Sequence, residues 1–181
     1  MATRPSEQLI DLLNAQIAME FGNHNTYLML AAWCEDRSLS GLSAFFRGQG
    51  FEEYMHAMLI YTWMLDWDLP VKLDAIPATE FQIDSAARLL EIALESEEAT
   101  TNAIHAIYDR ADEEKIWAIR DAFSWFVNEQ VEEIAVAKEN LDRGRLTGDS
   151  GAALLEFDRE IAAKAGSPPP LPAGAKTPVE G

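Results

Sequence analysis

The sequence predicts an all-α protein: a four-helix bundle with one long crossover between its second and third helices, plus a short fifth C-terminal helix. Apolar residues recur at helical spacing almost throughout, and no strong strand alternation interrupts them. Four stretches are long enough for bundle helices. The connection over residues 68–84 is long, contains two prolines and has no helical period.

Each helix has start or stop signals in the sequence. Ser6 follows Pro5 and can cap the first helix. Asp112 offers a cap for the fourth, with Glu113 and Glu114 favourable in its first turn. The boundary between helices three and four is weakly marked, since RADEEK contains neither Gly nor Pro. The expected helices cover residues 6–37, 41–67, 85–110, 112–144 and 151–165.

The length of the crossover indicates its route. A helix of about 27 residues is about 40 Å long, and the connection reaches about 56 Å when extended. The chain can therefore return along a whole helix, which makes helices two and three parallel. We expect residues 1–166 to form one domain and the Pro/Gly-rich residues 167–181 to form a disordered tail.

Composition excludes several classes of protein. The chain carries 31 acidic and 14 basic residues, a net charge of −17, which argues against nucleic acid and anionic membranes as partners. Acidity favours cations, although it also simply keeps proteins in solution. Cys34 is the only cysteine, which excludes a disulfide framework and a Cys-based zinc site. No apolar run or signal segment is present, so we expect a cytoplasmic protein.

The apolar stripe of each long helix is interrupted near its midpoint by polar residues. Midpoints of antiparallel helices lie at one level, so these residues should converge on one small volume. Glu53 and His56, at positions i and i+3, point to the same side of their helix. The converging set is Glu20, Glu53, His56, Glu97, Gln130 and Glu133.

Four carboxylates in one buried site cannot all stay ionised and unpaired, because several kcal/mol per ion would be lost. Two divalent cations would neutralise them. A lone helical Glu is usually a solvated surface residue, and a lone His on an apolar face is usually a hydrogen-bonded core residue. The coincidence on four stripes favours metal binding. Oxygen ligands with one or two nitrogens suit Fe, Mn or Zn.

Other polar and aromatic residues lie close to these positions. Glu52, Glu129 and Glu132 each precede a stripe residue and form either a solvated face or a third, weaker metal position bridged by Glu133. Tyr27 and Trp125 are either core residues or electron donors to an oxidised centre. His24 and His105 are better explained as core or surface residues than as ligands.

Three segments resemble the non-haem bacterial ferritins of the ferritin-like di-iron family. They are QIAMEFGNHNTYL in the first helix, FEEYMHAM in the second and FSWFVNEQVEEI in the fourth. The resemblance covers about residues 6–165. It implies a ferroxidase that stores ferric mineral inside a hollow shell of 24 subunits, with the fifth helices clustered at four-fold axes.

The resemblance also implies roles for individual residues. Glu20, Glu53 and His56 match the ligands of a first iron. Glu53 bridges to a second, held with Glu97 and Glu133, while Gln130 lies beside it and Tyr27 near the centre. Glu52, Glu129 and Glu132, with Glu133, match a third iron site.

The chain departs from relatives that bind haem. Bacterioferritins carry a second Glu-x-x-His in the fourth helix, where this chain has Gln130 and Glu133, and a haem-ligating Met at the position of Tyr54. We therefore expect no haem. Arg120 and Phe123 stand where animal ferritins carry acids in their three-fold channels, which leaves only Asp121 as a substitute.

The predicted function is iron storage with ferroxidase activity, in which two Fe(II) are oxidised by O₂ or H₂O₂ in a homo-oligomer. Two alternatives remain at this point. One is a di-iron or di-manganese oxidase that stores nothing, and the other is a bundle that binds divalent ions without redox chemistry.

Overall fold

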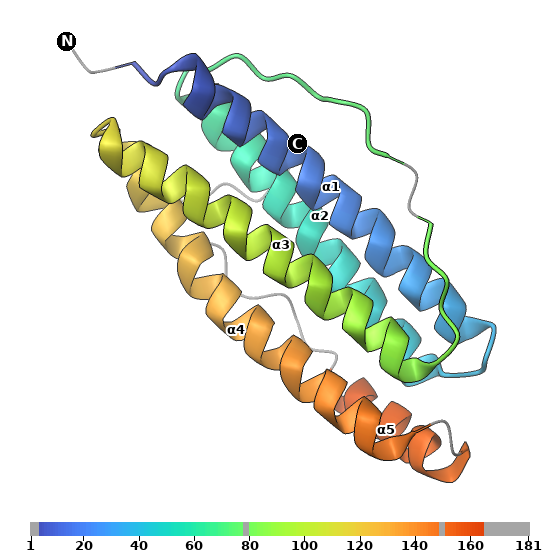
Figure 1. The fold of residues 1–181 in the computed structure, drawn as a ribbon. Helices are drawn as coiled ribbons and strands as arrows, with labels where there is room; N and C mark the ends of the chain where they lie inside the picture. The colour runs from blue at the N-terminus through green and yellow to red at the C-terminus, as the bar shows by residue number, and fades with distance from the viewer. Residues whose placement is uncertain (1–3, 78–79, 149–150, 165–181) are drawn as a thin grey trace.

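The computed structural model describes residues 4–77, 80–148 and 151–164, and this part of the chain folds into five helices. The first four form a bundle, and the fifth packs at one end of it (Figure 1). The all-α fold with one crossover is therefore confirmed. The predicted tail, residues 167–181, lies outside the described residues. The helices are α1 (Glu7–Glu35), α2 (Ser40–Asp66), α3 (Ala86–Glu113), α4 (Trp117–Thr147) and α5 (Gly151–Lys164).

The predicted cap of α1 is present. Ser6 Oγ accepts a hydrogen bond from the backbone N–H of Leu9 at 3.2 Å. The backbone N–H of Ser6 in turn donates to Glu114 Oε2 at 2.8 Å. The start of α1 is thus tied to the end of α3, at the end of the bundle opposite α5 (Figure 1).

Three helices end in the same way without using glycine. Ser38, Asp68 and Lys115 follow α1, α2 and α3 in the left-handed backbone region, with φ of 58°, 53° and 58°. The next residue is buried and apolar in each case, and its N–H bonds to a carbonyl five residues earlier, as in a Schellman motif. The bonds are Leu39 N to Cys34 O, Leu69 N to Met64 O and Ile116 N to Ala111 O, at 2.9–3.0 Å.

This turn corrects the predicted start of α4. Asp112 caps nothing, because α3 continues to Glu113 and α4 begins at Trp117. Burial of Ile116 at the turn fixes the boundary, and Asp112 instead accepts a 3.1 Å hydrogen bond from Arg120.

The crossover runs along the outside of the bundle and makes α2 and α3 parallel (Figure 1). Side chains of α1 hold it at both ends. Asn14 donates to Pro70 O at 3.2 Å and accepts from Lys72 N at 2.6 Å. Trp33 Nε1 donates to Ile83 O at 3.0 Å. The described parts of the crossover are therefore anchored to α1 near Pro70 and near Ile83.

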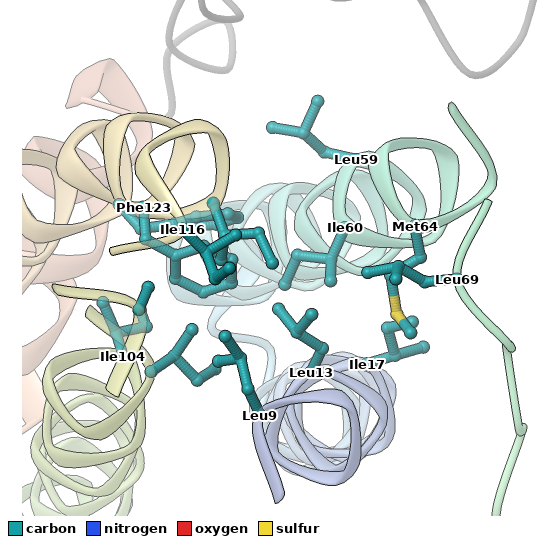
Figure 2. Close-up of a cluster of buried hydrophobic side chains, with 14 of the residues drawn as sticks. Leu9, Leu13, Ile17, Leu59, Ile60, Met64, Leu69, Ile104, Ile116 and Phe123 are labelled. Carbon is teal, nitrogen blue, oxygen red and sulfur yellow. The ribbon is translucent and has the colours of Figure 1, made fainter. Parts of the chain in front are cut away.

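Two separate apolar cores fill the bundle. Figure 2 shows the first core, which includes Leu9, Leu13, Ile60 and Phe123. The second core lies toward α5 and contains Leu30, Phe46, Leu90 and Phe157, among others. A layer of polar side chains separates the two cores, so the bundle is apolar at both ends and polar in its middle.

α5 is docked through the N-terminus of α2. Asp158 Oδ1 accepts a 2.8 Å hydrogen bond from the backbone N–H of Leu42. A Cβ at Gly41 would lie 1.8 Å from the carbonyl oxygen of Asp158, so only glycine allows this approach. Among the described residues, no helix is long and apolar enough to cross a membrane.

Candidate metal centre

The predicted ligand residues lie together in the polar layer between the two cores. Glu20 is fully buried, Glu53 and His56 are 2% exposed, and Glu97 is 4% exposed. Gln130 is buried as well, and Glu133 is half-buried. Each helix of the bundle contributes at least one of these side chains, because its midpoint faces the bundle axis at this level.

Glu20, Glu53 and His56 form the most compact group. One ligand atom from each lies within 4.8 Å of the others. Glu20 Oε2, Glu53 Oε2 and His56 Nε2 are buried and have no hydrogen-bond partner. Buried polar atoms without partners cost about 1–3 kcal/mol each. A bound divalent cation would satisfy all three, so the donor set fits a metal ion.

Glu97 and Glu133 are linked through an amide. Gln130 Nε2 donates to Glu97 Oε2 at 3.4 Å and also to Glu133 Oε2. Tyr27 OH donates to Glu97 Oε1. The two carboxylates that the family resemblance assigns to a second metal are therefore linked through Gln130, and Tyr27 contacts one of them, Glu97.

Burial controls the protonation of the centre. It raises the pKa of Glu20 to about 7, against opposing hydrogen bonds from Glu53 and Gln16. Burial, with repulsion from neighbouring carboxylates, raises the pKa of Glu53 and Glu133 well above the ordinary value. It lowers the pKa of His56 to about 4, so this imidazole is neutral near pH 7. A neutral imidazole is a competent metal ligand.

One member of the neighbouring acidic group, Glu52, lies against the same centre, whereas Glu129 and Glu132 belong to neither group of close ligand atoms. Ligand atoms of Glu52, His56 and Glu133 lie within 4.8 Å of one another. Burial, followed by the charges of Glu129 and Glu97, raises the pKa of Glu52 to about 7. Burial and the charge of Glu132 raise the pKa of Glu129. The sequence predicts that Glu133 is shared between the central ligands and the neighbouring acidic group. In the structure, His56 also has ligand atoms close to both Glu20 and Glu53 on one side and Glu52 and Glu133 on the other.

Two hydrogen-bonding residues next to the centre were given no role in the sequence analysis. Gln16 lies one turn before Glu20 and donates to Glu20 Oε1 at 2.7 Å. Thr101 Oγ1 lies 2.7 Å from Gln130 Oε1. Gln16 lies on the interrupted apolar stripe of α1, so its position in the sequence could have indicated that it faces the centre. Thr101 is next to the stripe of α3, and only the packing of α4 brings Gln130 to it.

The remaining candidates have other surroundings. His24 Nδ1 lies 2.6 Å from the carbonyl oxygen of Gly50, and His105 is exposed. The ring of Trp125 packs edge-on against His56, with centroids 5.7 Å apart. Neither His24 nor His105 belongs to either group of ligand atoms.

A four-helix bundle with buried carboxylates and one histidine at its midpoint is the arrangement of the ferritin-like class. Residues 10–147 match the ferritin family, described as a ferritin-like domain. The chain belongs to this family.

Named relatives support this assignment. The chain is 31% identical over 159 residues to a bacterial non-heme ferritin of Staphylococcus saprophyticus, covering 88% of this chain and 95% of the relative. It is 30% identical over 156 residues to a bacterial non-heme ferritin of Campylobacter jejuni, covering 86% and 93%.

Solved structures agree. An open pore ferritin from Archaeoglobus fulgidus superposes with a TM-score of 0.85 at 34% identity, covering 90% of this chain and 98% of that chain. A humanized archaeal ferritin gives a TM-score of 0.87 at 30% identity, covering 92% and 100%. The similarity therefore includes α5 as well as the bundle.

Proposed function

We propose that this protein is an iron-storage subunit that oxidises Fe(II) to Fe(III) at a two-iron centre within its bundle. The observation that carries the proposal is the set of three unpartnered, buried ligand atoms on Glu20, Glu53 and His56. Iron is the substrate of this reaction and the stored material.

Each residue has a defined task in this proposal. Glu20, Glu53 and His56 bind the first Fe(II). Glu53 is shared with the second, which Glu97 and Glu133 also bind. The carboxyls have raised pKa values and release protons as the metals arrive.

The two remaining residues contact the second position. Gln130 donates its amide to Glu97 and Glu133 and fixes their spacing. Tyr27 donates its hydroxyl to Glu97. Removing either one would leave the carboxylates less constrained without removing a ligand.

The electron balance requires two metals. Two Fe(II) give up one electron each, and O₂ takes up both electrons and two protons to become H₂O₂. With H₂O₂ as the oxidant, the same two electrons and two protons give two water molecules. The chain contributes ligand geometry and charge compensation, which need no dedicated general base.

The neighbouring acidic residues extend the proposal. Glu52, Glu129 and Glu132, with Glu133, are proposed as a third and weaker iron position on the solvent side of the centre; the support is that ligand atoms of Glu52 and Glu133 lie within 4.8 Å of each other. No haem is proposed, because Tyr54 stands where a haem-ligating Met would be needed.

Assembly completes the storage function. We propose a homo-oligomeric shell of 24 subunits with the mineral inside. Support comes from the family and from the superposition of nearly the whole chain on ferritins of Archaeoglobus fulgidus. The docked α5 supports a shell over a small bundle protein that acts alone.

One experiment tests these points together. Fe(II) is added anaerobically and then mixed with air, while absorbance, oxygen consumption and particle mass are followed. Rapid oxidation of two irons per subunit in a particle of roughly half a megadalton is expected. Oxidation no faster than that of free Fe(II) would contradict the ferroxidase assignment.

The two alternatives give different results in the same experiment. A non-storing di-iron or di-manganese oxidase would oxidise Fe(II) in a small oligomer that never mineralises. A redox-inert bundle would bind divalent ions and consume no oxygen.

A further inference from the structure

Gln16 is a buried amide at the edge of the first core. It lies on α1 between Leu13 and Ile17, which are both fully buried, and it is itself 1% exposed. Burying an amide costs free energy unless its polar atoms are hydrogen-bonded. An apolar side chain would avoid this cost in the metal-free bundle, so the contacts of the amide have to explain its place.

The protein satisfies only one end of the Gln16 amide. Gln16 Nε2 donates to Glu20 Oε1 at 2.7 Å, one helical turn further along α1. Gln16 Oε1 is buried and has no hydrogen-bond partner. Turning the amide over would not relieve this, because its carbonyl oxygen would then face a carboxylate oxygen, and neither atom can donate when Glu20 is ionised.

The two oxygens of Glu20 differ in the same way. Oε1 accepts the hydrogen bond from Gln16, whereas Oε2 has no hydrogen-bond partner. Gln16 therefore leaves one oxygen of Glu20 for a metal ion, together with the unpartnered atoms Glu53 Oε2 and His56 Nε2. A hydrogen bond to a ligating carboxylate orients it toward the metal.

The amide of Gln130 differs from that of Gln16 at its carbonyl end. Gln130 Nε2 donates to Glu97 and Glu133, and Gln130 Oε1 lies 2.7 Å from Thr101 Oγ1. Both ends of that amide thus have protein partners. At Gln16 the carbonyl end is left free beside the first metal position.

A bound metal ion would supply the missing donor. Three protein ligands leave at least one position open on a divalent ion, and water fills the open position at such sites. The O–H groups of a metal-bound water can donate, and Gln16 Oε1 is a buried acceptor next to the carboxylate that would hold the ion. Both ends of the amide are then satisfied in the metal-loaded protein.

We propose that Gln16 is a positioning residue of the first metal position. Its N–H holds Oε1 of Glu20, so that Glu20 binds the ion through Oε2 alone, and its carbonyl oxygen accepts a hydrogen bond from a water molecule on the ion. The inference rests on the proposed two-iron centre and adds to it a residue that itself touches no metal.

Binding of Co(II) or Zn(II) tests this inference without oxidation. In Gln16→Met the side chain keeps its length but can neither donate to Glu20 nor accept from water. Gln16→Asn keeps the amide and shortens its reach, in case the apolar change prevents folding. Thr26→Val is the control, because Thr26 is a buried residue of α1 whose hydroxyl donates to the backbone oxygen of Gly22, at 3.1 Å, rather than to a ligand.

Anaerobic Co(II) titration should give a Kd for the first ion that is about tenfold higher in Gln16→Met than in the wild type. Gln16→Asn should also bind more weakly, and Thr26→Val should match the wild type. The rise in Tm that Zn(II) produces should shrink in Gln16→Met, whereas a merely structural role would lower the Tm of the metal-free and loaded forms alike. Equal Kd values for Gln16→Met and the wild type would overturn the inference.

Crystals of the wild type loaded with Zn(II) test the contacts directly. Glu20 should bind the ion through Oε2 alone, with Gln16 Nε2 on Oε1 and a metal-bound water donating to Gln16 Oε1. Contact of both Glu20 oxygens with the ion, or any other partner for Gln16 Oε1, would overturn the inference. A wild type that binds Co(II) but fails to oxidise Fe(II) would instead overturn the proposed function, so the two failures are distinguishable.

Discussion

Glu52 and Glu53 are adjacent on α2 and chemically identical, yet they have different surroundings. Glu53 is 2% exposed and has a carboxylate oxygen without a hydrogen-bond partner. Glu52 is half-buried and accepts a 2.8 Å hydrogen bond from Gln49. One residue along a helix is a rotation of about 100°. This rotation moves a carboxylate from the bundle axis to its solvent side.

The difference predicts different metal affinities for the two groups. A buried, unpartnered carboxylate gains most from a cation, because the ion replaces water that burial has removed. A half-exposed carboxylate retains some solvation and gains less. The centre around Glu53 should therefore bind tightly, and the group around Glu52 weakly.

The largest expected effect is that of Glu53→Ala. This change removes the ligand shared by both irons, so rapid Fe(II) oxidation should fall by more than the roughly 10–100-fold that loss of a supporting partner costs. Stopped-flow absorbance measures it. Oxidation at the wild-type rate would show that the shared-ligand assignment is wrong.

Metal binding should strengthen steeply with pH. The pKa of Glu20 is raised to about 7, so binding near pH 6 must displace its proton. His56, with its pKa lowered to about 4, is already neutral there. The Kd for Zn(II) should fall by at least about tenfold from pH 6 to pH 7, because Glu53, whose pKa burial raises well above its ordinary value, also releases a proton. Calorimetry in two buffers should detect the released protons, and pH-independent binding would contradict the burial of Glu20.

Glu52→Gln should change the pH dependence of stability in the metal-free protein. The folded-state pKa of Glu52 is raised from 4.5 to about 7. Its contribution to the free energy of unfolding is therefore complete below pH 4.5 and lost as the pH rises through about 7. Relative to the variant, the wild type should lose on the order of 1 kcal/mol across this range, since partial exposure reduces the effect. Urea unfolding at pH 4.5 and 8 measures it, and parallel curves for the two proteins would refute it.

The smallest effect on initial rate is expected for the triple variant Glu52→Gln, Glu129→Gln and Glu132→Gln. Fast oxidation of the first two irons should stay within about threefold of wild type, because the buried ligands remain. Iron binding beyond two per subunit should be lost. Equilibrium dialysis with Co(II) counts the sites. A loss of the fast phase as large as that of Glu53→Ala would show that the central ligands and the acidic group around Glu52 do not have separate roles.

The fold was predictable wherever local signals agreed with the final packing. Ser6 as a cap and the length of the crossover are local properties, and both predictions are confirmed. Asp112 was a misleading signal. Asp112 is a good capping residue, but burial of Ile116 fixes the left-handed turn at Lys115, so α4 begins after this turn.

The residues of the centre could also be predicted from the sequence, although their assignments as metal ligands stay predictions. Polar residues at the midpoints of four apolar stripes must meet if the helices pack at all. The contacts of Thr101 were not predictable, since Thr101 meets Gln130 only through the pairing of α3 with α4.

The sequence by itself determined the helices, their order and the layer of buried carboxylates, because helical period and residue type are carried by each segment alone. Only the tertiary structure decided which ligand atoms of Glu20, Glu53 and His56 are left without hydrogen-bond partners and which carboxylates the amide of Gln130 joins. These features depend on the relative depth and rotation of neighbouring helices. Side chains distant in sequence set both.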